Sequence, residues 1–303
     1  MNVEAELSVV RTRRRINIRE LAIEKLIVAA GGATIAIVLL IFVYLLKDAL
    51  PVLRTESLSE LLFGRDWYPL SGVFGMLPLI LGSLLVTAGA VVIGVPIGVA
   101  AAVYIGEIAS PRIREVLKPT VETLAAIPSI VVGFLGYMLL APWLKQIFHL
   151  PTGLTALAGS IMLAFMAMPT IISISEDALN AVPKDYRASS LALGATQWQT
   201  IRRVVVPAAR SGIIASVMLG IGRAIGETMT VLMVTGNARS FPHGLLDSVR
   251  TMTSNIAIEL GEVPYYTTHY YALFAIGLVL FIMTFGVNLV ADVVLNKYQE
   301  REQ

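Results

Sequence analysis

The chain has 303 residues, of which 56% are apolar and only 15% charged, and its mean hydropathy is +0.76. These values exclude an ordinary soluble globular domain, in which about 25% of residues are charged. The net charge of +2 does not indicate a nucleic-acid partner, the lack of cysteine excludes disulfides and thiolate metal sites, and the three scattered histidines predict no metal centre. We therefore expect a membrane protein whose apolar helices each cross the bilayer with about 20 residues.

The first 25 residues are polar and carry six Arg and Lys residues. The uncharged stretch that follows, residues 26–46, is longer than the apolar core of a signal peptide, which has about 7–15 residues, and no small-residue cleavage site follows it. We predict a retained first span over 26–46. The basic segment 1–25 is expected to lie in the cytoplasm beside anionic lipid.

The second uncharged stretch, residues 67–106, is long enough for one long span or for two tight ones. No charged hairpin interrupts it, and Trp67, Tyr68 and Pro69 at its start are typical of an anchor at the membrane surface. We favour one tilted or bent helix near 74–105, loosened near its inner end by Pro96.

Two further spans are expected before the long polar interval. The charged segment 107–122 predicts a loop or a surface helix. A third span is expected near 123–144 with a turn at Pro128, and a fourth near 152–175 with an interruption at Pro169.

The polar interval 176–208 has the pattern of two short helices with a break between them. Pro183 precedes the first helix, and Gly194 is placed to end it in a left-handed conformation. Thr196 followed three residues later by Gln199 is a capping-box pattern for the second helix. Pro207 stands where this second helix would enter the membrane.

The spacing of this interval resembles the cytoplasmic coupling loop of ABC importer permeases. That family has E-A-A, three residues, Gly, nine residues, Ile, any residue and Leu-Pro. Gly194 and Pro207 keep this spacing, with Val204 and Val206 in the apolar positions. The alternative is an ordinary helix–turn–helix connection between two spans.

The resemblance implies that an ATPase docks on this loop at Arg187, Ala188, Ser189, Gly194 and Pro207. The E-A-A positions hold Ala188, Ser189 and Ser190, so the acidic residue of the family pattern is missing. Arg187, Ser189 or the segment 183–186 are the candidates to replace its contact.

The fifth span, expected near 209–237, carries charge well inside an apolar run. Each ion at mid-bilayer costs about 2.5–3.5 kcal/mol. The i,i+4 spacing puts Arg223 and Glu227 on one helix face, where we expect them to pair, with Thr228 beside them. The pair either lines a polar route through the bundle or locks this helix to a neighbour as a structural ion pair.

The stretch 244–262 has apolar residues at helical spacing and predicts an interfacial helix, to which we assign no site. It either contributes to a docking surface for a binding protein or simply packs on the end of the bundle. A sixth span is expected near 270–292, and a charged tail, 296–303, follows.

Lys and Arg are distributed unevenly between the two sides of this arrangement. Sixteen lie in the N-terminal segment, the 107–122 segment, the 176–210 loop and the tail, against six in the other three connections. The positive-inside rule therefore places both termini and the coupling loop in the cytoplasm. Two spans within 67–106 would invert this orientation and disagree with the charge bias.

Several stretches resemble the permease subunits of the high-affinity phosphate ABC importer, the Pst system. They are G-R-A-I-G-E-T-M at 222–229, V-T-G-N at 234–237, L-A-A-I-P-S-I at 124–130, L-G-A-T at 193–196, and W-Y-P and F-G-x-L-P within 67–78. The polar segment before the second span and V-R-T-M-T at 249–253 resemble the PstC-type subunit more than its PstA-type partner.

This resemblance implies an all-α membrane protein of about six transmembrane helices, with the type I ABC importer permease fold (MetI-like) over 26–295 and a cytoplasmic coupling helix. It also implies a bacterial inner-membrane location and three partners: a PstA-type permease, a PstB-type ATPase dimer and a PstS-type periplasmic phosphate-binding protein. The chain lacks a Gly-rich phosphate loop, so we expect no catalytic residue and no cofactor in it, with ATP and Mg bound by the partner.

The resemblance further implies that Arg223 recognises phosphate oxygens through its planar guanidinium. Glu227 would keep that binding brief, as conduction requires. Three other functions stay open: import of another oxyanion such as molybdate, sulfate or phosphonate, a scaffold that signals phosphate status, and a membrane-embedded enzyme. The enzyme would need a nucleophile–base pair or metal ligands in the spans, where only one Arg–Glu pair is visible.

Overall fold

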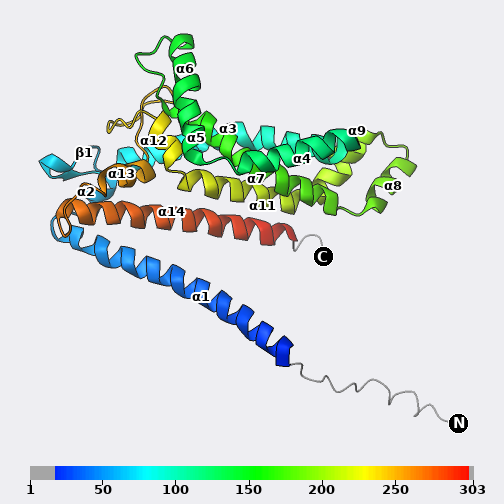
Figure 1. The fold of residues 1–303 in the computed structure, drawn as a ribbon, viewed down its shortest axis with the longest axis horizontal. Helices are drawn as coiled ribbons and strands as arrows, with labels where there is room; N and C mark the ends of the chain where they lie inside the picture. Colours follow the sequence, from blue (N-terminus) through cyan, green and yellow to red (C-terminus); the bar gives the residue numbers. More distant parts are fainter. Residues whose placement is uncertain (1–17, 300–303) are drawn as a thin grey trace.

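The computed structural model describes residues 18–299. The basic residues before position 18 and the last four residues of the tail lie outside this part of the chain. Figure 1 shows an elongated bundle of helices, from which α1 splays away at its N-terminal end. The start of α1, the end of α14 and the pair α8–α9 all lie toward the same end of the bundle.

The elements up to the fourth span are α1 (Ile18–Ala49), α2 (Leu58–Phe63), the strands β1 (Trp67–Tyr68) and β2 (Val73–Phe74), α3 (Leu77–Val103), α4 (Pro111–Ala125), α5 (Ser129–Leu135), α6 (Ala141–Ile147) and α7 (Ala156–Ala181). Short 3-10 turns cover Leu50–Arg54 and Pro69–Ser71, and β1 and β2 form an antiparallel hairpin. π-helical turns extend α3 over Tyr104–Ile108 and join α5 to α6 over Gly136–Leu140.

The remaining elements are α8 (Lys184–Ala192), α9 (Gln197–Thr200), a π-helical turn (Ile201–Val205), α10 (Val206–Ala208), α11 (Arg210–Gly226), α12 (Met229–Val234), α13 (Met252–Glu259) and α14 (Thr268–Gln299).

The six predicted spans correspond to helices of the described chain. Five of its helical segments are long and apolar enough to cross a bilayer, and a sixth is formed if the bent pair Gln197–Ala208 and Arg210–Gly226 counts as one span. The stretch 67–106 contains a single span, Leu77–Ile108, so the prediction of one long helix is confirmed. Pro96 is accommodated inside that helix without a break.

Two local predictions in the third and fourth spans are wrong. The third span begins at Ser129, because Pro128 disfavours helical backbone at the residue before it and residues 123–125 instead complete α4. The fourth span is not interrupted at Pro169, since α7 continues through it to Ala181. Pro169 is buried within the bundle, and packing from neighbouring helices keeps the helix intact despite one lost hydrogen bond.

The core lies where α3, α7 and α11 pack together, and α7 is the most buried of the candidate spans. Small residues let these helices approach closely. A Cβ at Gly94 would lie 3.3 Å from Ala164, and one at Gly98 would lie 3.0 Å from Ile171. In contrast, α1 contacts mainly α14, for example through the rings of Phe42 and Phe281, and leaves its other faces exposed.

The stretch 244–262 differs most from its prediction as an interfacial helix. Only Met252–Glu259 is helical, and the start of this helix is buried in the bundle. The backbone N–H of Met252 donates to Ser83 Oγ at 2.9 Å, and a Cβ at Gly82 would lie 2.5 Å from the carbonyl oxygen of Arg250. The segment 249–255 therefore reaches inward against α3, and we call it the inserted segment.

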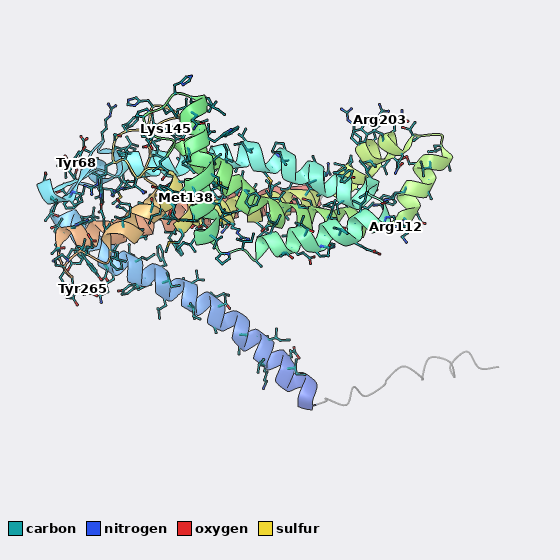
Figure 2. All side chains as sticks on the ribbon, turned by 45° about the horizontal axis from the view of Figure 1, so that its top comes forward. Tyr68, Arg112, Met138, Lys145, Arg203 and Tyr265 are labelled. Carbon is teal, nitrogen blue, oxygen red and sulfur yellow. The ribbon has the colours of Figure 1, made fainter. Side chains whose placement is uncertain are left out.

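Trp67 also differs from its predicted role as a surface anchor. Its side chain is fully buried and packs edge-on against Phe74 and His269. Tyr68 and Leu70 beside it are exposed. The hairpin of β1 and β2 therefore packs against the bundle through Trp67. Figure 2 shows Tyr68 and Tyr265 at this end of the molecule, and Arg112 and Arg203 at the opposite end.

The close approach at Gly82 gives a test of the inserted segment. Gly82→Ala places a methyl group against the backbone of Arg250 and should destabilise the protein by about 1–3 kcal/mol, the usual cost of overpacking. The measurement is the Tm of the detergent-solubilised protein. Gly31→Ala is the control, because a Cβ there has no atom within 4 Å. Equal Tm values for the two variants would contradict the packing described here.

Candidate functional site

The predicted fifth span, 209–237, is broken at the position where the sequence places its charges. α11 ends at Gly226, Glu227 has an extended backbone with ψ of 131°, and α12 begins at Met229. Gly226 has a low helix propensity, which favours an end at this point. A second change of direction lies near the membrane entry, where the helices on either side of Ala209 are bent by 69°.

The expected i,i+4 ion pair between Arg223 and Glu227 is wrong for this structure. Within the described residues the two side chains form no ion pair, because the extended backbone of Glu227 takes it off the helix face that carries Arg223. Arg223 Nη1 instead donates to Thr170 Oγ1 of α7 at 3.4 Å. Glu227 Oε1 accepts from the backbone N–H of Thr230 at 3.2 Å.

The carboxylate of Glu227 therefore caps the first turn of α12, where backbone N–H groups have no partner within the helix. Thr228 Oγ1 donates to the carbonyl of Gly226 at 3.3 Å and stays at the break. Thr230 Oγ1 donates to the carbonyl of Ser129 at 3.0 Å, and Thr253 Oγ1 of the inserted segment donates to the carbonyl of Glu227 at 2.9 Å. The bond from Thr253 thus satisfies a backbone carbonyl at the break from a neighbouring element, and the bond from Thr230 ties α12 to the start of α5.

Exposure shows which way this break faces. Arg223 and Gly226 are exposed, and Glu227 and Thr228 are half-buried. A guanidinium at this depth in a span cannot lie among lipid tails without a large cost. The face that carries Arg223, Glu227 and Thr228 must therefore adjoin water or another protein. Behind it, a void of about 10 Å³ bordered by Ser83, Thr87 and Thr251 has room for about one water molecule.

A charged cluster that the sequence does not predict is centred on Glu259, at the C-terminal end of α13. One oxygen of its carboxylate accepts from Arg250 Nη1 at 2.8 Å, and Arg239 Nη2 lies 3.6 Å away. The other oxygen accepts from Trp67 Nε1 at 3.0 Å and lies 2.8 Å from His269 Nε2. Arg250 and His269 are 9 and 10 positions from Glu259, but Trp67 is 192 positions away, so the sequence alone does not show that these side chains meet.

The Glu259 cluster fixes the inserted segment. Arg250 is 8% exposed, and it also donates to Asn255 Oδ1 at 3.0 Å and to the carbonyl of Asn237 at 3.0 Å. Burial, and secondarily the charge of Arg239, lower the pKa of Arg250, yet an arginine stays protonated in a protein. Its charge therefore requires the carboxylate of Glu259.

The coupling loop has the predicted local structure. Gly194 adopts a left-handed conformation with φ of 84° between α8 and α9. Thr196 and Gln199 form the predicted capping box at the start of α9. The side chains at Ala188, Ser189 and Pro207 are exposed. A groove of about 580 Å³ runs between the two arms of the loop and is lined by Tyr186, Leu193, Gln199 and six neighbouring residues.

Arg187 is the exception among the residues predicted to meet an ATPase. Its side chain is 24% exposed and turned inward. The guanidinium donates to the carboxylate of Glu107 and to the carbonyl oxygens of Leu179 and Val182. Its N–H groups therefore bind partners within the chain. Ala188, Ser189 and Gly194 remain on the exposed face of the loop, where an ATPase is predicted to dock.

The Glu259 cluster generates a stability prediction. Glu259→Gln removes the charge that offsets buried Arg250, and breaking such a buried pair costs about 3–5 kcal/mol. The Tm of the purified protein should fall clearly. Glu262→Gln, on the exposed end of the same stretch, should leave it unchanged. A Tm that is the same in both variants would show that Glu259 does not hold the inserted segment.

Comparisons with known proteins identify the family. Residues 94–301 match the family described as binding-protein-dependent transport system inner membrane component. The chain is 37% identical to the probable ABC transporter permease protein YqgH of Bacillus subtilis, over 94% of this chain and 93% of that protein. It is 33% identical to the phosphate transport system permease protein PstC of Mesorhizobium japonicum, over 99% of this chain and 98% of that protein.

Solved structures share the fold at lower identity. A bacterial ABC transporter involved in import of the acidic polysaccharide alginate matches with a TM-score of 0.60 and 14% identity, over 92% of this chain and 98% of that one. The MetNI methionine ABC transporter in an inward-facing conformation matches with a TM-score of 0.55 and 20% identity, over 74% and 94%. The chain therefore belongs to the inner membrane components of binding-protein-dependent transport systems, the permease subunits with the type I ABC importer fold.

Proposed function

We propose that this chain is a PstC-type permease subunit that carries inorganic phosphate across the bacterial inner membrane. The observation that carries the proposal is an exposed arginine beside a break in a membrane span. The similarity over nearly the whole chain to a protein named as a phosphate transport system permease supports phosphate as the cargo.

Arg223 has the chemistry for an oxyanion. Among the described residues it makes one hydrogen bond, at the long distance of 3.4 Å, so most of its donors are available for phosphate oxygens. Because it is not paired with Glu227, its positive charge is not neutralised by that carboxylate. Glu227 and Thr228 lie at the same break, where the negative charge of Glu227 would repel a second anion and shorten the stay of the first.

Each proposed partner corresponds to an exposed surface of the chain. A second, PstA-type permease would cover the face of Arg223 and close a pathway between the two subunits. A PstB-type ATPase dimer, holding ATP and Mg, would dock on the groove of the coupling loop, since this sequence carries no phosphate-binding loop. A PstS-type binding protein would deliver phosphate at the opposite end.

The orientation with both termini and the coupling loop in the cytoplasm is part of this proposal. It is supported by the excess of Lys and Arg on that side. The position of the start of α1, the end of α14 and α8–α9 toward one end of the bundle is consistent with it (Figure 1).

The pathway residues give the first functional test. Arg223→Ala removes the group that binds phosphate oxygens, and uptake should fall by about ten- to a hundredfold, as expected for lost hydrogen bonds to a charged group. Glu227→Ala should reduce uptake as well, because it uncaps α12. The measurement is uptake of labelled phosphate by cells that depend on this importer, with the variant's membrane level followed by immunoblot.

Arg112→Ala is the matched control for that test, because Arg112 is an exposed arginine of α4 that lies toward the end of the bundle that carries Arg203 (Figure 2). It should retain normal uptake. Normal uptake in either pathway variant, at a normal membrane level, would overturn the assigned roles.

Competition tests the choice of anion. Sulfate, molybdate or a phosphonate, added in excess over labelled phosphate, should leave uptake unchanged if phosphate is the cargo. Strong inhibition by one of these anions would transfer the same site and mechanism to that oxyanion.

A further inference from the structure

We propose that Arg187 and Glu107 form the joint through which the coupling loop moves the second span. The inference rests on the proposed function, since it concerns how ATP-driven movement of the loop reaches the pathway. Arg187 is a positioning residue here: it acts through Glu107 and touches neither phosphate nor ATP.

The contact has the geometry of a strong, directional link. Arg187 Nη2 donates to Glu107 Oε1 at 2.5 Å and Nε donates to Oε2 at 3.2 Å, so the guanidinium holds both carboxylate oxygens. Such two-pronged pairs fix orientation as well as distance. The side chains are 24% and 8% exposed, which limits the screening of their charges by water.

The same guanidinium also closes the end of α7. It donates to the carbonyl oxygens of Leu179 at 2.9 Å and Val182 at 2.8 Å. Carbonyl groups at a helix C-terminus have no partner within the helix and carry partial negative charge. One side chain of α8 therefore ties the coupling loop to the ends of two spans, α3 and α7.

The other arm of the loop reaches the same residue of the second span. Gln197 Nε2, at the start of α9, donates to the backbone carbonyl of Glu107 at 3.4 Å. Glu107 lies in the π-helical turn Tyr104–Ile108, whose carbonyl groups at Ile105 and Gly106 accept from Arg114 of α4. The turn is thus held by α8, α9 and α4 together. π-helical turns are frequent at functional positions.

The contact between Arg187 and Glu107 links the coupling loop to the spans more directly than the chain itself does. From the loop, the chain enters α11 through the 69° bend at Ala209, so movement of α9 and α10 is not directed along α11. The second span runs as one helical segment from Leu77 to Ile108. At its other end, Ser83 accepts from Met252 of the inserted segment, and Thr253 of that segment donates to the carbonyl of Glu227.

A continuous set of contacts therefore joins the coupling loop to the break in the fifth span through α3. Movement of the loop would shift α3, and α3 would shift the inserted segment that supports Glu227. Spatial continuity becomes coupling only if disrupting the joint separates ATP hydrolysis from transport.

The test uses Glu107→Gln, which keeps the shape of the side chain and removes the charge that holds Arg187. The complete transporter, with its partner permease, ATPase and binding protein, is reconstituted in lipid vesicles. Phosphate moved per ATP hydrolysed is measured for each variant. We expect this ratio to fall on the order of tenfold, a typical size for a coupling effect, while ATP hydrolysis changes by less than about twofold. Arg187→Lys, which keeps the charge but not the two-pronged contact, should lower the ratio in the same direction.

Asp177→Asn is the matched control. Asp177 is also an ion-paired carboxylate at this end of the bundle, 3.0 Å from Lys118 Nζ, but it lies in α7 and pairs with α4 rather than with α8 or α9. Its ratio should equal that of the unaltered transporter. An unchanged ratio in Glu107→Gln would overturn the inference, and so would a parallel loss of transport, ATP hydrolysis and assembled complex, which indicates a purely structural role. Failure of the unaltered transporter to move phosphate would instead overturn the proposed function.

Discussion

A lipid bilayer offers no hydrogen-bond partners, so a break in a membrane span has to be completed by the protein itself. At the break around Glu227, hydrogen bonds from the surrounding residues fulfil this requirement. Glu227 caps α12, the carbonyl of Ser129 accepts from Thr230, and Thr253 of the inserted segment donates to the carbonyl of Glu227. The polar groups that remain open, above all Arg223, lie on one exposed face. That face is where an anion and a second subunit would meet this chain.

The inserted segment explains why a distant charged cluster matters to the break. Its position depends on Arg250, whose buried charge requires Glu259, and on Ser83 and Gly82 of the second span. Glu107 lies near the end of the second span, and the coupling loop holds it from both arms. The two ends of the molecule are therefore joined by one helix and a small number of named contacts. An importer needs such a connection, because ATP is hydrolysed far from the transported ion.

Features governed by neighbouring residues could be predicted from the sequence. The spans follow from hydropathy, and the turn at Gly194 and the capping box of Thr196 and Gln199 follow from local backbone rules. The ion pair of Arg223 and Glu227 was wrong because its spacing presumes an unbroken helix. The contact of buried Trp67 with Glu259 joins residues 192 positions apart, and the contact of Arg187 with Glu107 joins residues 80 positions apart. No periodic pattern records such contacts, and the continuity of α7 through Pro169 likewise depends on packing.

The most direct test of this account asks whether the break in the fifth span meets water. The chain has no cysteine, so a single introduced thiol reports one position. In membranes that contain the complete transporter, Thr228→Cys should react with a charged, water-soluble thiol reagent, and excess phosphate should slow the reaction. Leu40→Cys on the exposed face of α1 should stay unreactive, because lipid covers it. A Thr228→Cys thiol as inert as the one at position 40 would contradict the account, since the break would then be sealed from the pathway.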